Sequence, residues 1–340
     1  MSARAVIFPV FVPHLGCPHR CVFCDQRWIS GAERAASAAD VYDAAAKSAA
    51  LPPSGAKRQL AFYGGSFTAI PLSQQEALLG AASDAIARGE IDSIRLSTRP
   101  DAIDESVLER LKRFGVETIE LGAQSMDDAV LFLSGRGHTA ADTERAARMI
   151  RAAGFKLILQ MMTGLPGDSP EKDMATARAL IALQPDGVRI YPTVIVRGTE
   201  LYERWREGNY REHTVEDAVE ICAELLPLFE QSGIPVIRLG LNPSEELSGG
   251  EAAGGAYHPA LGELVRSRIL LDRARALLGG AEAGSRVALG TAEASLSQAI
   301  GQGRRNLKAL KEEFSLAEIT MRPLRDVGKG EIVLLSIEKP

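Results

Sequence analysis

Cysteine is scarce in this sequence, with four among 340 residues, and a small scaffold held together by disulfides is therefore excluded. Long apolar runs are lacking too, since no stretch approaches the roughly 18 residues of a membrane-spanning helix. Neither sign of charge dominates, because 39 basic and 44 acidic residues leave a net charge of −5. That balance does not indicate binding of nucleic acid through overall charge. The first 14 residues lack the apolar core and cleavage site of a secretory signal, so we expect a cytoplasmic protein without membrane contact.

The apolar content of the chain indicates a folded protein. Hydrophobic residues make up 46% of the chain, which excludes a disordered polymer. The length allows one large domain of roughly 250 residues and a small one.

Short β-branched apolar runs alternate with longer segments of helical periodicity. We predict strands at residues 5–12, 58–63, 93–98, 116–121, 155–161, 186–191 and 234–239. We predict helices near residues 35–50, 73–89, 104–114, 139–153, 170–183 and 214–232. This alternation indicates an α/β fold with parallel strands, in an open sheet or a barrel. Functional residues are then expected in the loops after the C-terminal strand ends.

Two segments break this alternation. Residues 241–262 are rich in Gly and Ala without periodicity and indicate a loop or linker. From about residue 281 the pattern changes to strand, helix and two strands, typical of a small α+β domain. We therefore divide the chain into a domain at 1–240, a loop and connecting helix at 241–280 and a small domain at 281–340.

Three cysteines stand in C-x3-C-x2-C spacing directly after the first strand: Cys17, Cys21 and Cys24. Three thiols within eight residues of a polar loop seldom serve as packing, and the compartment disfavours a disulfide. A zinc site with His14 or His19 as fourth ligand is one alternative. The other is a [4Fe–4S] cluster held by three thiolates, with one iron open to a small molecule. The fourth cysteine, Cys222, is expected to be a small buried hydrophobe on a helix.

Further motifs surround the cysteines. Phe23 precedes the last cysteine, and Tyr63-Gly64-Gly65-Ser66 follows the second strand. With these residues the chain resembles the radical S-adenosylmethionine (SAM) superfamily. The resemblance implies that the three cysteines hold a [4Fe–4S] cluster whose open iron chelates the methionine amine and carboxylate. Gly64, Gly65 and Ser66 match the turn that contacts the amine, where glycines let the backbone approach closely and where many members have an acidic residue in place of Ser66.

The resemblance continues through the later strand ends. The motifs there are Ser97-Thr98-Arg99-Pro100-Asp101, Leu121-Gly122-Ala123-Gln124-Ser125, Ser134-Gly135-Arg136-Gly137-His138-Thr139, Thr163-Gly164-Leu165-Pro166-Gly167-Asp168 and Arg189-Ile190-Tyr191-Pro192-Thr193. Over residues 5–240 they look like the radical domain of the elongator catalytic subunit family, and more distantly like oxygen-independent coproporphyrinogen oxidases. This implies a partial (β/α)6 barrel, open on one side, with the cofactor at the C-terminal strand ends.

The resemblance also implies which residues contact the cofactor: Phe23, Gly64, Gly65, Ser66, Thr98, Arg99, Asp101, Gln124, Met161 and Gly164. For several an ordinary structural role stays open. Arg99 and Asp101 could pair on a surface loop, Met161 and Met162 could fill the core, and Gly164 could only make a turn. No catalytic residue is identified from the sequence, and the candidates for a catalytic role are Gln124, Tyr191 and His258. His138 either lines the site or only precedes a helix that Thr139 caps.

The chemistry that the resemblance implies is radical chemistry. A reduced cluster passes one electron to the sulfonium, and a 5′-deoxyadenosyl radical forms and abstracts hydrogen from a substrate carbon. This requires an external one-electron reductant such as flavodoxin or ferredoxin.

The C-terminal segment resembles a KH module, in which an I-G-x-x-G turn between two helices clamps a nucleic-acid backbone. Ile300-Gly301-Gln302-Gly303 fits the opening of that turn, but Arg304 stands where the last glycine belongs. The candidates for RNA contact are Gly301, Gly303, Arg304, Arg305 and Lys308. With Lys311 the segment has four cations and no acid over eight residues, which suits phosphate. The alternative is a small structural domain with a solvated basic helix.

These observations together predict a radical SAM enzyme acting on RNA, a tRNA base in particular. Two alternatives stay open: the same chemistry on a small molecule such as a tetrapyrrole, and a non-catalytic iron–sulfur protein that binds RNA. The elongator catalytic subunit family carries an acetyltransferase domain after its radical domain. The 100 residues after residue 240 contain no glycine-rich acyl-CoA loop, so acetyl transfer is not part of the prediction.

Overall fold

The computed structural model describes residues 5–12, 21–25, 34–52, 55–241 and 251–340. They form two compact units, each described here by itself. The first contains residues up to 214 together with 228–257, and the second contains 215–227 together with 258–340.

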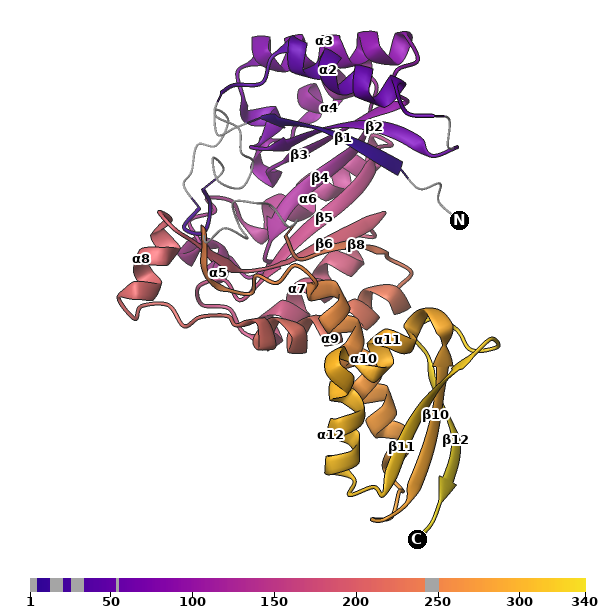
Figure 1. Ribbon diagram of the computed structural model, residues 1–340. Coiled ribbons are helices and arrows are strands. Elements are labelled where there is room, and N and C mark those ends of the chain that lie inside the picture. The colour runs from indigo at the N-terminus through magenta and orange to yellow at the C-terminus, as the bar shows by residue number, and fades with distance from the viewer. Residues whose placement is uncertain (1–4, 13–20, 26–33, 53–54, 242–250) are drawn as a thin grey trace. The chain divides into compact units, whose positions relative to one another are not determined.

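The first unit is built on a seven-stranded parallel sheet that curves into a half-barrel (Figure 1). In sheet order the strands are β1 (Ala5–Val12), β2 (Lys57–Gly64), β3 (Ser93–Thr98), β4 (Val116–Gln124), β5 (Lys156–Thr163), β6 (Gly187–Pro192) and β8 (Val236–Leu239). The predicted α/β partial barrel is confirmed, and each of the seven apolar runs forms a strand. The resemblance implied six strands, and β8 adds a seventh that pairs with β6 in parallel.

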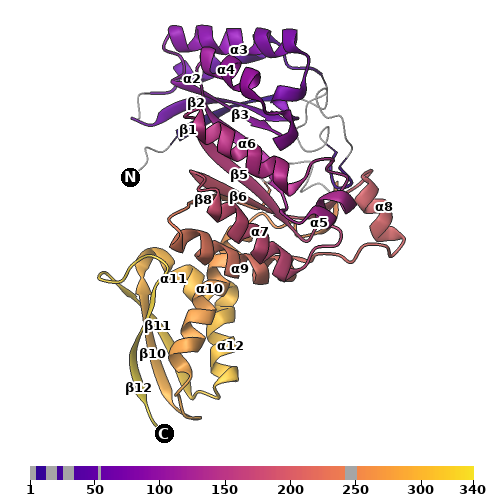
Figure 2. The ribbon, with the colours of Figure 1, turned by 180° about the vertical axis from the view of Figure 1, so that it is seen from behind.

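Helices pack along one face of this sheet and leave the other face to the interior of the half-barrel (Figure 2). They are α2 (Ala38–Ala49), α3 (Leu72–Ala87), α4 (Glu105–Arg113), α6 (Ala140–Ala152) and α7 (Pro170–Ala182), with the shorter α5 (Asp128–Leu133) and α8 (Glu200–Arg206) nearby in the chain. Strand β5 shows how the faces divide. Leu157, Leu159 and Met161 are fully buried on one face, while Gln160 and Met162 alternate with them on the other.

One part of the predicted loop at residues 241–262 is a strand. Strand β9 (Ala252–Gly255) pairs in antiparallel fashion with β7 (Val194–Val196), and residues 242–250 lie outside the described part. The β9 sequence AAGG has no β-branched or aromatic residue, so propensity could not predict it. The strand forms because β7 offers partners for its backbone.

The second unit contains the small α+β domain predicted from residue 281, and it also includes residues 215–227 and 258–280. Its elements are the first part of α9 (Val215–Gln231), then α10 (Leu261–Leu278), β10 (Arg286–Ala292), α11 (Leu296–Ile300), α12 (Arg305–Glu313), β11 (Glu318–Leu324) and β12 (Ile332–Glu338). Strand β10 lies in the middle of a mixed sheet, parallel to β11 and antiparallel to β12.

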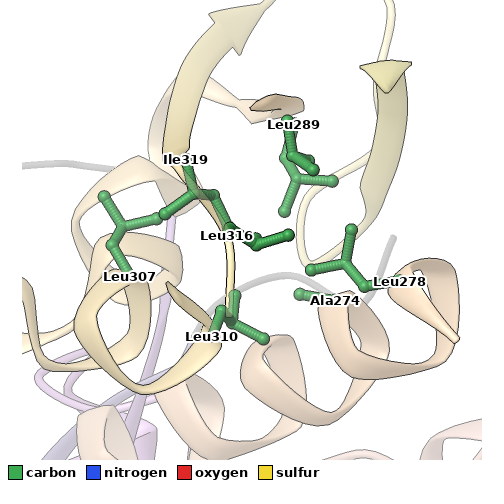
Figure 3. Close-up of a cluster of buried hydrophobic side chains, with 8 residues drawn as sticks. Ala274, Leu278, Leu289, Leu307, Leu310, Leu316 and Ile319 are labelled. Carbon is green, nitrogen blue, oxygen red and sulfur yellow. The ribbon is translucent and has the colours of Figure 1, made fainter. Parts of the chain in front are cut away.

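Helices and sheet of this unit share one apolar core (Figure 3). Its buried side chains are Ala274, Leu278, Val287, Leu289, Leu307, Leu310, Leu316 and Ile319. Cys222 in α9 is fully buried too, as expected of a small hydrophobe. Within the described part of the chain, no helix is long and apolar enough to cross a membrane.

Candidate functional site

The described part of the cysteine loop forms a tight turn. The backbone N–H of Cys24 donates to the carbonyl of Cys21 at 3.1 Å, and neither residue is in a disulfide. Cys17, His14 and His19 lie outside the described residues. Among the residues that are described, no three His, Cys, Asp or Glu side chains are grouped as metal ligands.

Residues between these cysteines attach the turn to the half-barrel. The N–H of Val22 donates to the carbonyl of Ser134 at 3.1 Å, and the carbonyl of Val22 accepts from the N–H of Leu201 at 2.7 Å. Phe23 packs with Tyr191 against a buried apolar cluster of Val130, Met162 and Leu165. The cysteine turn therefore lies at the C-terminal ends of β5 and β6, where a site was expected.

The glycine turn after β2 is locked to the end of β1. The N–H of Gly65 donates to the carbonyl of Val12 at 2.6 Å. Gly64 has a φ of +102°, and a Cβ there would come 2.9 Å from the same carbonyl oxygen, so only glycine fits without strain.

Ser66 connects this turn to the end of β3. Its hydroxyl oxygen lies 2.9 Å from Oγ1 of Thr98 and accepts the N–H of Arg99 at 3.1 Å. All three residues are buried. Nε of Arg99 donates to Asp101 at 2.5 Å, and its Nη2 donates to the carbonyl of Arg136. The Arg99–Asp101 pair thus joins two strand-end loops.

Gln124 ends β4 in an unusual backbone conformation. Its φ is +66°, which costs a non-glycine residue roughly 1 kcal/mol, and its side chain is buried. Oε1 of Gln124 accepts from Nε2 of Gln160 at 3.2 Å. Such strain clusters at functional sites, and contact of Gln124 with a ligand stays a prediction.

His138 is buried against the end of β4. Its Nε2 donates to the carbonyl of Ala123 at 3.2 Å. Burial, together with the positive charge of Arg136, lowers the pKa of His138 to about 4, so the imidazole is neutral at neutral pH. Thr139 caps α6 through a reciprocal capping box with Asp142, so the cap itself does not need the histidine.

The turn after β5 has neighbours that the sequence did not indicate. Gly164 has a φ of +70°, and the ring of His213 occupies the space where a Cβ would lie. Nε2 of His213 is 3.0 Å from Oγ1 of Thr163, and the Tyr210 hydroxyl donates to the Gly164 carbonyl at 2.5 Å. Met161, a predicted cofactor contact, is fully buried on the strand face opposite to Gln160.

A charged network crosses the interior of the half-barrel. Oε1 of Glu120 accepts from the Tyr63 hydroxyl at 2.9 Å and from Nη1 of Arg95 at 3.0 Å, and Arg189 pairs with Oε2 at 2.8 Å. Arg189 also donates to the hydroxyls of Tyr63 at 2.8 Å and Tyr191 at 3.1 Å. Burial, and then the Glu120 charge, raise the pKa of Tyr63 to about 12, so the phenol keeps its proton.

This network was not predicted, although the sequence of the strands contains a sign of it. Arg95, Glu120 and Arg189 are charged residues inside otherwise apolar strands, at positions whose side chains face the interior. Strands β2 and β6 are not neighbours in the sheet, so the contact from Tyr63 to Arg189 spans the half-barrel.

The remaining predicted site residues lie in the second unit. Nδ1 of His258 accepts the N–H of Ala260 at 3.1 Å, just before α10. The predicted RNA turn joins α11 to α12, and these helices connect the parallel strands β10 and β11. Gly301, Gly303 and Arg304 all have positive φ, at +75°, +59° and +64°.

The basic side chains of this turn are exposed: Arg304, Arg305, Lys308 and Lys311. In the described part of the chain none of them is in an ion pair. Asn306, which the sequence did not single out, is buried between them. Its Nδ2 donates to the carbonyls of Gln298 and Ala299, each at 3.2 Å, and so holds the end of α11 against the start of α12.

Comparison with curated proteins finds relatives of the first unit. The tRNA uridine(34) acetyltransferase of Methanocaldococcus infernus is 30% identical over 187 residues, covering 49% of this chain and 35% of the relative. That of Dehalococcoides mccartyi is 41% identical over 118 residues, covering 34% and 26%. Elongator complex protein 3 of Mus musculus is 29% identical over 192 residues, covering 51% and 35%. These alignments span between a quarter and about a third of each relative's length.

Comparison with solved structures agrees on the fold. The archaeal Methanocaldococcus infernus Elp3, solved with an N-terminal deletion, superposes with a TM-score of 0.60 at 22% identity. The superposition covers 83% of this chain and 66% of that one.

Two family models match the chain. The model of the radical SAM C-terminal domain matches residues 185–270. The model of the radical SAM superfamily matches residues 11–180, half of the chain, and includes the cysteine turn and the strand ends up to β5. The chain belongs to the radical SAM superfamily.

Proposed function

We propose that this radical SAM enzyme acts on RNA, with a base of tRNA as its substrate. The observation that carries the proposal is the exposed basic turn between α11 and α12, in a chain whose other unit is a radical SAM half-barrel. The names of the relatives, which include tRNA uridine(34) acetyltransferases, support the same substrate class. The proposal covers the radical chemistry alone and not acetyl transfer.

The family implies a [4Fe–4S] cluster and SAM, and the described residues fit both groups. Thiolates are the ligands of such clusters, and Cys21 and Cys24 share one turn in which a guanidinium lies near Cys21. We assign the cluster to Cys17, Cys21 and Cys24. Gly64 and Gly65 present a backbone without side chains, where the methionine part of SAM would bind.

The chemistry that these groups supply when bound is abstraction of a hydrogen atom from the substrate by a carbon radical. The protein must keep hydrogen-atom donors other than the substrate away from that step. Phe23 and Tyr191 pack against Met162 and Leu165 beside the cysteine turn and would line the region where that step takes place. Gln124, held in its strained conformation, presents its amide at the same edge of the sheet.

The basic turn would bind the phosphate backbone. Gly301 and Gly303 expose the backbone of the turn at two positions, while Arg304, Arg305 and Lys308 give it positive charge. Binding of this kind depends on salt, because each phosphate contact releases counterions.

The proposal is tested by the release of 5′-deoxyadenosine. The full chain is reconstituted with its cluster without oxygen, given SAM and dithionite or flavodoxin as reductant, and assayed with and without bulk tRNA. We expect tRNA to stimulate release. If tRNA does not change the amount of 5′-deoxyadenosine released, the result contradicts an RNA substrate and favours a small molecule such as a tetrapyrrole. No release from an intact cluster would favour a non-catalytic iron–sulfur protein.

The role of the turn is tested by charge reversal. Arg304→Glu with Arg305→Glu should weaken tRNA binding and lower the slope of log affinity against log salt by about 1.4, for two phosphate contacts to a single strand. Arg322→Glu with Arg325→Glu makes the same charge change at exposed positions elsewhere in the second unit. Equal losses in the two variants would show that net charge, rather than this turn, binds RNA.

A further inference from the structure

Arg136 lies against a cluster cysteine. Its Nη1 donates to Sγ of Cys21 at 3.2 Å, and its Nη2 donates to the carbonyl of Gly122 at the end of β4, at 2.7 Å. The residue is 8% exposed. Gly135 and Gly137 on either side have φ values of +65° and +70°, which bend the loop so that the arginine points inward.

The loop that carries Arg136 is tied to the cysteine turn at a second point. The carbonyl of Ser134 accepts the N–H of Val22, the residue after Cys21. On its other side, the carbonyl of Arg136 accepts a hydrogen bond from Arg99, which Asp101 holds in place. The backbone on either side of the Arg136 side chain is therefore held by bonds to two other loops, and the guanidinium itself is held by the carbonyl of Gly122.

The charge of Arg136 has no acidic partner. In the described part of the chain no carboxylate pairs with it, and its buried Nε has no hydrogen-bond partner. The nearby Arg99 is neutralised by Asp101, and the low pKa of His138 keeps that side chain uncharged. A buried cation without an anion is costly, so this position calls for a negative charge on the atom that it faces. Sγ of Cys21 as a thiolate ligand supplies it.

We propose that Arg136 is a positioning residue for the cluster. Its guanidinium holds Sγ of Cys21 in place as a ligand, and its positive charge makes the cluster easier to reduce. Reduction by one electron adds negative charge, and a fixed cation in a buried site stabilises the more negative state. The inference rests on the cluster that the family implies and not on the RNA substrate, so it stands or falls separately from the substrate proposal.

The test measures the cluster itself, without SAM or tRNA. Arg136→Gln removes the charge, Arg136→Lys keeps it, and Arg148→Gln removes an arginine charge from an exposed position on α6, where the side chain is 71% exposed. Each full-length variant is reconstituted without oxygen, its iron per chain is measured, and its midpoint potential is determined by a redox titration with dithionite followed by electron paramagnetic resonance.

We expect Arg136→Gln to make reduction roughly tenfold less favourable, a shift of about 59 mV to more negative potential for a one-electron couple. Arg136→Lys and Arg148→Gln should keep the wild-type potential. A loaded Arg136→Gln variant with the wild-type potential would overturn the proposal, as would a shift in Arg136→Lys as large as that in Arg136→Gln.

If Arg136→Gln does not retain a cluster, its midpoint potential cannot be measured, and the Arg136→Lys variant then provides the test. Normal iron content and potential in the lysine variant would support the proposal, because charge alone then restores the ligand. Iron loss in both variants would overturn it, because the role would then depend on packing rather than charge.

Discussion

Glu120 is the buried carboxylate that pairs with two arginines in the half-barrel interior. Its side chain is 3% exposed, and it is the shared partner of Arg95 and Arg189, whose side chains are 13% and 15% exposed. A buried ion pair adds little net stability when intact, yet removal of one partner leaves the other charge buried and unpaired. Glu120 is a single carboxylate that pairs with two arginines, so its removal would leave both positive charges buried and unpaired.

We therefore expect Glu120→Gln to lower the free energy of unfolding by about 3–5 kcal/mol, measured by urea denaturation. Glu144→Gln is the control, because Glu144 pairs with Arg148 on the surface of α6. That change should stay within about 0.5 kcal/mol. Similar small effects in both variants would contradict the role assigned to Glu120.

Arg304 occupies a left-handed conformation, with φ +64°, at the position where the KH turn has glycine. Arg304→Gly should raise the free energy of unfolding by about 1 kcal/mol, because glycine accepts this backbone without strain. It should also weaken tRNA binding, since a cation is lost. The neighbouring Arg305→Gly is the control: its φ is −57° at the first residue of α12, so glycine relieves no strain there and should not raise the free energy of unfolding.

At the scale of elements, the start of α7 holds two acidic side chains close together. Asp173 in the first turn is 3% exposed and shares a hydrogen bond with Asp168 in the preceding loop. Burial, and then the charge of Asp168, raise the pKa of Asp173 well above its usual range. Burial also raises the pKa of Asp168. Asp173 is therefore protonated in the folded protein at neutral pH.

This protonation predicts how stability depends on pH. Above about pH 4 the unfolded chain releases the proton that folded Asp173 keeps, so stability falls as pH rises towards the folded pKa, by up to about 1.4 kcal/mol per pH unit. Asp173→Asn should flatten this dependence and be more stable than wild type at about pH 8. Urea denaturation at several pH values measures it, with Asp43→Asn on the exposed side of α2 as control. A variant that keeps the wild-type slope would contradict the assignment.

The strands and helices whose own residues show a clear apolar pattern were predicted from the sequence. All seven strands of the half-barrel and its longer helices follow from apolar runs and helical periodicity, because those patterns reflect burial on one face. The short strands β7 and β9 could not be predicted, since their pairing joins Val194 to Gly255 across 60 residues and no local pattern marks it.

At the scale of the whole molecule, the proposed cluster ligands and the proposed RNA-binding turn lie in different units. Cys21 and Cys24 lie in the first unit, while the basic turn rests on the apolar core of the second. Leu310 is a fully buried member of that core.

Leu310→Ala should lower the stability of the second unit by about 2–5 kcal/mol, because a buried side chain is replaced by a cavity. We expect weaker tRNA binding together with unchanged iron per chain after reconstitution. Both quantities are measured on the full-length protein. Loss of iron together with unchanged tRNA binding would contradict the assignment of cluster binding to the first unit and of RNA binding to the second.

The sequence by itself determined the superfamily, the α/β half-barrel, the small second domain and the positions where ligands are expected. This was possible because cysteine spacing, glycine turns and apolar periodicity are local features of the chain. Only the tertiary structure decided which side chains meet: Arg136 contacts Cys21 from 115 positions away, and Tyr63 contacts Arg189 from 126 positions away. Such pairs depend on how the strands curve around a shared interior, which no short segment encodes.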